Sequence, residues 1–328
     1  MMTSHPTLEV VGLRRTFSGS AMPKVALEHV DLQIAEGEIV GVLGVNGAGK
    51  TTLIKILSTL LLPTAGTVRV CGHDVVREAK RVRALTSMVL GGERGLYGRL
   101  TALDNLHFFA MLSGLSRAEV KRSALPALEA VGLGEAAGVR VETFSRGMRQ
   151  RLHLAIGLIG SPRLLLLDEP TAGLDPPEAE RLRQSVAKLR SEGVSILLTS
   201  HQLLDIERLA DRVVLLQGGR ITHDLALPEF LRQASSVATL AISGTGTVLS
   251  AMTEHPVVRE GQTRLTAAEN SWTLELPVER WTPELLHSVE QLVGLAGTAD
   301  VQVRPVGLED VFQLLTGSAG SEPRTDSR

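Results

Sequence analysis

The segment GVNGAGKTT at residues 44–52 has the residue types and spacing of a phosphate-binding loop, GxxxxGK[ST]. Its glycines let the backbone curl until successive N–H groups point at one spot, where the following helix presents the positive end of its dipole. In that geometry Lys50 reaches the β and γ phosphates of a nucleotide, and the Thr51 hydroxyl contacts a magnesium ion. The segment therefore predicts a nucleoside triphosphate site formed by Asn46, Gly47, Gly49, Lys50, Thr51 and Thr52.

The residues on either side of this loop decide its interpretation, because glycine-rich turns between strands and helices are common. Residues 38–43 (EIVGVL) read as a buried parallel strand, and residues 52–57 (TLIKIL) read as a helix with one apolar face. A strand, a tight turn and a helix in this order form the setting in which the pattern binds phosphate.

Two acids end a second apolar strand. Residues 163–167 are followed by Asp168 and Glu169, and ligands of open α/β sheets bind beyond the carboxyl ends of the strands. Asp168 is placed to hold magnesium, and Glu169 is placed to orient and deprotonate an attacking water. Alone, an Asp-Glu-Pro run more often just ends a strand and begins a loop. The phosphate loop in the same chain favours the functional interpretation.

His201 follows a further apolar strand, residues 194–199, and leaves the sheet at the same edge. A neutral imidazole at this place could hydrogen-bond a γ-phosphate oxygen or the attacking water. A lone histidine at a strand end is usually structural, but its position relative to the other motifs makes His201 a candidate. His153 lies within an apolar helical stretch and is expected to pack or to face solvent.

Composition narrows the class of protein. The 328-residue chain has a net charge of −2 with both signs interspersed, which gives no electrostatic support for a nucleic-acid partner. The single cysteine, Cys71, cannot form an internal disulfide, which fits a reducing compartment. No apolar run approaches the roughly 18 residues needed to cross a bilayer, and the first residues lack the features of a secretory signal. We expect a chain that is soluble by itself.

The order of elements predicts an α/β fold with a core, a smaller appended domain and a tail. Residues 1–230 combine an antiparallel β subdomain, a helical subdomain at about residues 98–161, and strands that complete a doubly wound parallel sheet. Residues 231–316 read as a small α+β domain, with one helix that Thr282 caps and Pro283 begins. Residues 317–328 have no apolar anchor and are expected to be disordered.

Residues 144–151 (FSRGMRQR) complete a set of motifs that resembles the ATP-binding cassette ATPases, in order, over residues 7–225. Ser145 and Gly147 match the signature LSGGQ of that family, whereas three positions depart from it, namely Phe144, Arg146 and Met148. A serine hydroxyl and N–H groups at a helix start still suit a γ-phosphate. Read alone, this run is only a helix cap, and its place before Asp168 and Glu169 favours the resemblance.

The resemblance also extends to residues 171–175, similar to the D loop that crosses a dimer interface, and to His201, similar to the switch histidine. Phe17 lies where the family places an aromatic residue that stacks on adenine, although an isolated Phe after a strand is commonly a core residue. The family's glutamine, which touches magnesium and water, aligns with Gly92. Glu93 is the candidate substitute, but an ionised glutamate cannot donate a hydrogen bond.

The resemblance implies that the chain binds and hydrolyses ATP with Mg²⁺, and that two cassettes stack head to tail. ATP at Lys50 of one cassette would then be closed over by Ser145 and Gly147 of a second copy or of a different cassette chain. The chain would drive separate membrane-spanning permease subunits, bound peripherally at the cytoplasmic face of the cell membrane, and residues 95–111 resemble the surface that grips them. Residues 307–317 resemble the end of cassettes that serve exporters of drugs, antibiotics or lipids, including the daunorubicin-resistance type, although helical packing alone explains their apolar spacing.

Two other classes remain open. A soluble cassette ATPase that acts on nucleic acid or ribosomes usually carries two cassettes, a long inserted coiled coil or cysteine-rich zinc elements, and none of these is visible in the sequence. A phosphate-loop kinase or GTPase gives no reason for Ser145 and His201 to stand at their present spacing. The joint order of the motifs favours the transporter subunit.

Overall fold

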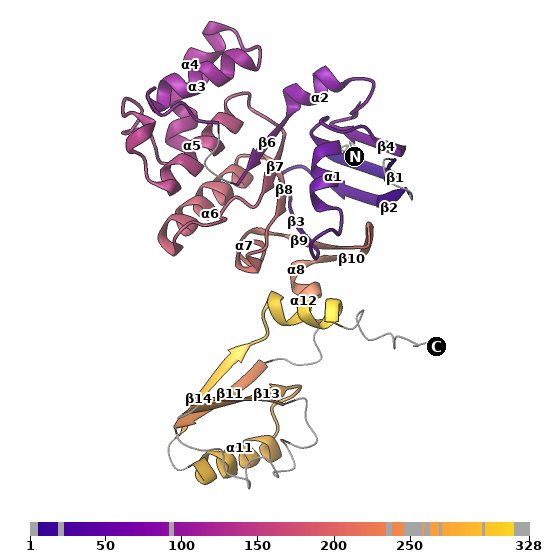
Figure 1. The fold of residues 1–328 in the computed structure, drawn as a ribbon, viewed down its shortest axis with the longest axis vertical. Coiled ribbons are helices and arrows are strands. Elements are labelled where there is room, and N and C mark those ends of the chain that lie inside the picture. Colours follow the sequence, from indigo (N-terminus) through magenta and orange to yellow (C-terminus); the bar gives the residue numbers. More distant parts are fainter. Residues whose placement is uncertain are drawn as a thin grey trace. The chain divides into compact units, whose positions relative to one another are not determined.

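The structure, a computed structural model, divides the chain into two compact units, Met1–Leu227 and Pro228–Arg328. Figure 1 shows both units, each of which is described by itself below. The structure describes residues 6–18, 23–91, 95–233, 238–245, 258, 263–268, 271–296 and 299–317.

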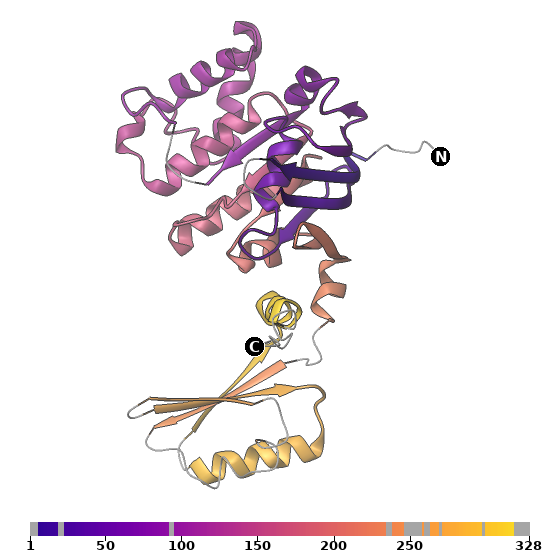
Figure 2. The ribbon, with the colours of Figure 1, turned by 45° about the vertical axis from the view of Figure 1, so that its right-hand side comes forward.

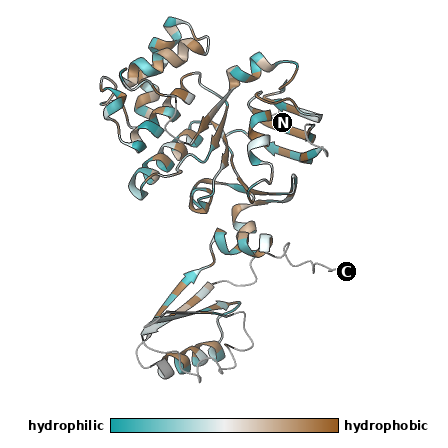
Figure 3. Cartoon of the chain, viewed as in Figure 1, coloured by the Kyte–Doolittle hydropathy of each residue, from teal (hydrophilic) through white to brown (hydrophobic). Residues whose placement is uncertain are grey.

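A six-stranded sheet forms the centre of the first unit, in the order β10-β9-β3-β8-β7-β6. Five of its strands run parallel, and β10 pairs antiparallel with β9. The strands read as continuous apolar runs because both faces of the sheet are buried. Figure 3 shows the central strands in the brown of hydrophobic residues. Their bounds are β3 Ile39–Leu43, β6 Thr86–Leu90, β7 Leu164–Asp168, β8 Ser195–Thr199, β9 Arg212–Gln217 and β10 Arg220–Ala226. The predicted parallel sheet is confirmed.

An antiparallel sheet in the order β2-β1-β4-β5 lies beside the parallel one. Apolar side chains of both sheets and of two helices form one core. The helix after the predicted phosphate loop therefore packs against side chains of both sheets. The elements are β1 Leu8–Phe17, β2 Lys24–Ile34, β4 Ala65–Val70, β5 His73–Asp74, α1 Lys50–Leu57 and α2 Ala79–Leu85. This core fixes the direction in which α1 presents its first turn.

The opposite face of the parallel sheet carries α5, α6 and α7, as Figure 1 shows. Gly41 of β3 permits close packing there, since a Cβ at Gly41 would stand 2.5 Å from Cγ2 of Ile206 in α7. Three helices, α3, α4 and α5, contact one another and form the predicted helical region. Their bounds, with the short 3-10 turn η1, are α3 Ala102–Leu112, α4 Arg117–Ala130, η1 Val141–Thr143, α5 Arg146–Leu158, α6 Pro176–Ser191 and α7 Leu203–Leu209.

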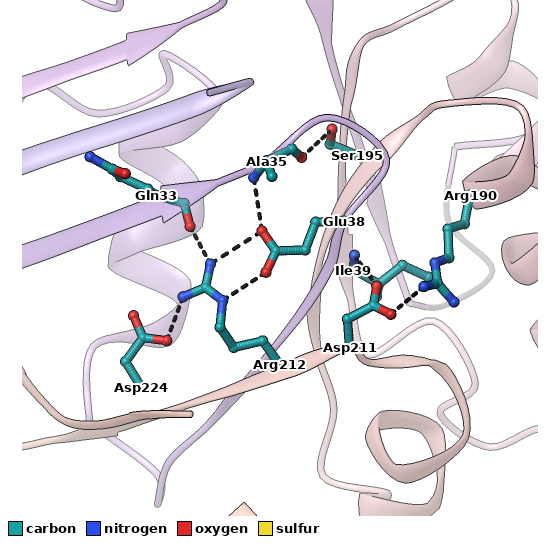
Figure 4. A network of polar contacts seen from close by, with 9 residues as sticks. All are labelled: Gln33, Ala35, Glu38, Ile39, Arg190, Ser195, Asp211, Arg212 and Asp224. Carbon is teal, nitrogen blue, oxygen red and sulfur yellow. Dashed lines mark hydrogen bonds and ion pairs between the residues drawn. The ribbon is translucent and has the colours of Figure 1, made fainter. Parts of the chain in front are cut away.

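A polar network at the amino edge of the parallel strands joins the two sheets (Figure 4). The guanidinium of Arg212, at the start of β9, donates to Glu38 at 2.7 and 3.3 Å, to Asp224 and to the carbonyl of Gln33 in β2. Burial by itself lowers the pKa of Arg212, but hydrogen bonds and charge from Glu38 and Asp224 raise it above its ordinary value. The arginine therefore stays charged and ties β2, β9 and β10 together at the edge opposite to the predicted site.

The second unit has a four-stranded antiparallel sheet in the order β12-β13-β11-β14, with α11 along one face (Figure 2). Alternating residues of β11 and β13 pack with Leu292 of α11. The Leu285 N–H donates to Oγ1 of Thr282 at 3.2 Å, so the predicted cap is confirmed. The elements of this unit are β11 Ala238–Thr245, β12 Arg264–Ala268, β13 Ser271–Val278, α11 Pro283–Ala296, β14 Ala299–Pro305 and α12 Leu308–Gly317. Helix α8, Leu227–Leu231, begins at the last residue of the first unit.

The tail prediction needs one correction at its first residue. Gly317 is the last residue of α12, because the helix that begins at Leu308 continues through it. Residues 318–328 lie outside the described residues.

The close approach of β3 and α7 yields a stability prediction. Gly41→Ala should lower the free energy of unfolding by about 1–3 kcal/mol, because the new methyl group overpacks against Ile206. Urea unfolding followed by circular dichroism measures the change. Gly138→Ala is the matched control, since a Cβ there meets no atom within 4 Å. Equal midpoints for the two variants would contradict the packing described.

Candidate functional site

The carboxyl edge of the parallel sheet opens into a cavity of about 310 Å³. Three segments reach it: the loop between β3 and α1, the end of β7, and His201, which lies two residues after the end of β8. The parallel register places them at this edge. Its lining includes the following predicted site residues: Phe17, Asn46, Gly47, Gly49, Lys50, Thr51, Thr52, Asp168, Glu169 and His201.

The phosphate loop has the backbone that its glycines predict. Gly47 and Gly49 have φ angles of 83° and 114°, in the left-handed region that side chains disfavour. A Cβ at Gly49 would also stand 2.6 Å from the backbone oxygen of Ala26, so the position has room only for glycine. Helix α1 starts directly after Gly49, and its first-turn amides have no side-chain cap. These amides and the helix dipole together form a site for an anion.

Lys50 is the buried cation of the cavity, with 9% of its surface exposed. Its Nζ donates to the Gly44 carbonyl and, at 3.4 Å, to the Val45 carbonyl. The ammonium is therefore held against the backbone of the phosphate loop. Burial lowers the pKa of Lys50, while the negative charges of Glu169 and Asp168 oppose that change. An anion bound in the loop would give the ammonium a charged partner in place of the backbone carbonyls that it contacts among the described residues.

Asp168 and Thr51 present oxygen atoms to the same cavity. Oδ1 of Asp168 accepts a hydrogen bond of 2.5 Å from Oγ1 of Thr199, the residue paired with it on β8, which orients the carboxylate. No group of three or more His, Cys, Asp or Glu side chains in the described ranges could hold a metal. A sparse oxygen set of this kind fits Mg²⁺, which keeps waters and phosphate oxygens as its remaining ligands.

Glu169 and His201 contact each other at the mouth of the cavity. The backbone N–H of His201 donates to Oε2 of Glu169 at 2.9 Å, and Nε2 of His201 lies 3.3 Å from Oε1. Glu169 has a φ of 53°, an unusual conformation for a side-chain-bearing residue. Its N–H donates to the Thr199 carbonyl at 3.0 Å, which helps to hold this conformation. Strained backbone of this kind tends to occur at functional sites.

Phe17 ends β1 at the rim of the cavity, with 39% of its surface exposed. The guanidinium of Arg15 lies 4.5 Å from the centre of its ring and donates to the Leu62 carbonyl at 3.0 Å. A cation over one ring face stabilises the ring in place. Phe17 is therefore not a core residue.

Ser145 and Gly147 do not line this cavity. Ser145 is exposed and caps α5, its Oγ accepting from the Met148 N–H at 3.1 Å. Gly147 is buried, and a Cβ there would stand 2.2 Å from the carboxylate of Glu178 in α6. The glycine is needed for this packing, a role that the sequence did not reveal. Gly92 and Glu93 lie outside the described residues.

Two residues that support the site could not be recognised from the sequence motifs. Thr199 stands in the sequence only as a strand end, and Arg15 as one charge on a strand, yet they orient Asp168 and Phe17. The i, i+2 spacing of Arg15 and Phe17 on a strand places them on one face and could have indicated the pair.

Comparison with known proteins places the chain among similar sequences. A profile of the ABC transporter family matches residues 27–172. The chain is 38% identical over 213 residues to the ABC transporter ATP-binding protein NatA of Bacillus subtilis, covering 65% of this chain and 87% of NatA. It is 37% identical over 297 residues to the daunorubicin resistance ATP-binding protein DrrA3 of Streptomyces coeruleorubidus, covering 90% of this chain and 92% of DrrA3.

Solved structures show the same fold. The ATP-binding cassette MJ0796, in a dimeric post-hydrolysis state bound to ADP and Pi, matches with a TM-score of 0.59 and 26% identity over 67% of this chain and 98% of its own. CbiO1 from Clostridium perfringens, part of the ABC transporter complex cbiONQ, matches with a TM-score of 0.62 over 70% of this chain and 94% of its own. At 24% identity, the second likeness shows the fold alone.

The setting of Lys50 yields a binding prediction. Lys50→Ala should weaken ATP binding by about tenfold or more, because charge-assisted hydrogen bonds contribute about 1.5–3 kcal/mol each. Titration with a fluorescent ATP analogue measures the dissociation constant. Lys55→Ala, which removes an exposed lysine from the same helix, should leave it unchanged. An unaltered affinity in Lys50→Ala would show that the loop does not bind the phosphates.

Proposed function

This chain belongs to the ATP-binding cassette transporter family, and we propose that it powers a separate membrane-spanning permease that exports a drug, antibiotic or lipid. It binds ATP and hydrolyses it to ADP and phosphate. The observation that carries the proposal is the single cavity in which the phosphate loop, two carboxylates and a histidine meet.

We assign the roles of the site residues from their geometry. The first-turn amides of α1 and the ammonium of Lys50 would bind the β and γ phosphates, and Phe17 would stack on the adenine. Glu169 would orient and deprotonate the attacking water, and His201 would hydrogen-bond the water or the γ-phosphate. Bound Mg²⁺, held by Thr51 and Asp168, would supply positive charge against the phosphates.

We propose a dimer of cassettes as the hydrolysing form. Ser145 is exposed at the start of α5 and absent from the lining of its own cavity, so its free surface is available to a nucleotide on a second cassette. The match to a dimeric cassette bound to ADP and Pi supports this arrangement. The partner would be a second copy of this chain or a different cassette, with Ser145 and Gly147 closing over its ATP.

Residues 95–111 offer an exposed apolar surface for the permease. Tyr97, Phe108 and Met111 are 49%, 40% and 54% exposed, and the rings of Tyr97 and Phe108 meet edge to face at 4.8 Å. The buried Asn105 holds the backbone of Tyr97 through hydrogen bonds of 2.8 and 3.0 Å, so the aromatic pair is fixed before any partner arrives. Exposed apolar patches of this kind mark interaction sites.

We infer the class of cargo from the match to DrrA3, and the location of the chain from its family and its helices. The match to DrrA3 spans 297 residues and therefore extends beyond the 227 residues of the first unit into the second. Among the described residues, no helix is long and apolar enough to span a bilayer. We propose that the chain acts as a peripheral subunit at the cytoplasmic face of the membrane, and that a separate protein supplies the membrane passage.

The proposed role of Glu169 predicts a trapped dimer. Glu169→Gln should lower the hydrolysis rate by about 100-fold or more, since general bases contribute about 10²–10⁴, while ATP binding persists. Gel filtration with ATP and Mg²⁺ should show a dimer that the unmodified protein forms only transiently. Glu207→Gln, at an exposed glutamate of α7, is the control and should behave as the natural chain. Only monomer with bound ATP, or unchanged hydrolysis, would count against the mechanism.

The proposed permease surface predicts a separation of functions. Phe108→Ser with Met111→Ser should abolish co-purification of the chain with its membrane-spanning permease, because the apolar contact is lost. Hydrolysis by the isolated cassette should persist, since neither residue lines the cavity. Leu204→Ser, at an exposed residue of α7, is the control and should retain the complex. Undiminished co-purification of the double variant would exclude this surface.

A further inference from the structure

Asp205 is a fully buried carboxylate beside the site that the reaction outlined above does not use. It lies in the first turn of α7, with 0% of its surface exposed. Its Oδ1 accepts from Nη1 of Arg183 at 2.8 Å, and its Oδ2 accepts from Oγ of Ser200 at 2.8 Å and from Oγ1 of Thr171. One carboxylate thus joins three separate segments of the chain.

The partners of Asp205 flank the Glu169–His201 pair. Thr171 stands two residues after Glu169, and Ser200 stands directly before His201. Arg183, in α6, is itself 7% exposed and neutralises the buried charge. A buried carboxylate is costly without such partners, so the network is expected to persist once formed.

The backbone around Glu169 requires a constraint of this kind. Its φ of 53° persists only if the surroundings determine it, since the conformation is sparsely populated by residues with side chains. On one side the Thr199 carbonyl accepts from the Glu169 N–H at 3.0 Å. On the other side the hydroxyl of the fully buried Thr171 is tied to Asp205.

We propose that Asp205 is a positioning residue that holds the loop after β7 and the loop after β8 in register, so that Glu169 and His201 meet. The shared acceptor Oδ2 sets the separation of Thr171 and Ser200, and through them the 2.9 Å contact between the His201 N–H and Oε2 of Glu169. Neither hydroxyl touches the cavity, so each acts through its neighbour. The inference rests on the roles proposed for Glu169 and His201.

The test removes each hydroxyl from the network and leaves the carboxylate paired. Asp205→Asn would remove the buried ionic partner of Arg183, whose Nε also lies 3.0 Å from Oε2 of the half-exposed Glu180, and would risk unfolding. Thr171→Val and Ser200→Ala are therefore the informative variants. Each should lower kcat for ATP hydrolysis by about tenfold and leave KM for ATP within about threefold, because the phosphate loop is untouched. Thr171→Ser and Ser200→Thr, which keep a hydroxyl, should restore at least half of kcat.

Ser195 supplies a matched control on the same strand. It is fully buried at the start of β8, accepts from the Gly37 N–H at 3.0 Å and lies 2.9 Å from Oγ1 of Thr7, at the edge opposite to the cavity. Ser195→Ala should lower the melting temperature as Ser200→Ala does, yet keep kcat near that of the natural chain. If the Asp205 network only stabilised the fold, Ser195→Ala and Ser200→Ala would have the same kcat.

Two outcomes would overturn the inference. One is kcat within twofold of the natural chain in both Thr171→Val and Ser200→Ala, and the other is a kcat loss in Ser195→Ala equal to theirs. Glu169→Gln, measured in parallel, separates this result from failure of the proposed function. If Glu169→Gln is inactive while the hydroxyl variants are active, only the positioning role fails. If one of the two hydroxyl variants does not fold, the kcat of the other variant decides whether the positioning role holds.

Discussion

The parallel pairing of β3, β7 and β8 is the constraint on which the site depends. Parallel strands end at one edge, so three segments that are far apart in the chain deliver a glycine-rich turn, two acids and a histidine to one cavity. The apolar runs that form the strands are buried on both faces and keep the register fixed. Polar networks then hold both ends of the sheet, with Arg212 at the amino edge and Asp205 at the carboxyl edge.

Charge is distributed unevenly between these two ends. At the amino edge Arg212 is fully paired with Glu38 and Asp224, and the network is self-contained. At the cavity, the hydrogen-bond partners of the buried Lys50 among the described residues are backbone carbonyls, and Asp168 offers carboxylate oxygen to the same space. The first arrangement stabilises a joint between sheets, whereas the second suits a ligand that carries both phosphate charge and a bound cation.

Much of the fold and part of the site could be predicted from the sequence. The apolar runs and the glycine positions are local signals, and they indicated the strands and the tight turn before α1. Thr282 and Pro283 indicated the start of α11. Asp168, Glu169 and His201 could be placed together because a strand end has a known position in a parallel sheet. The family that the order of the motifs indicated is also that of the relatives the chain matches, such as DrrA3.

The sequence by itself determined which backbone conformations were available and which residues stood at strand ends, because these depend on neighbours a few positions away. Only the tertiary structure decided that Gly147 makes room for Glu178, that Arg15 covers Phe17, and that Asp205 joins Thr171, Ser200 and Arg183. The contacts of Gly147 and Asp205 link residues up to 34 positions apart. Such contacts leave no periodic trace in the chain, since burial and hydrogen bonding across elements are set by packing in three dimensions.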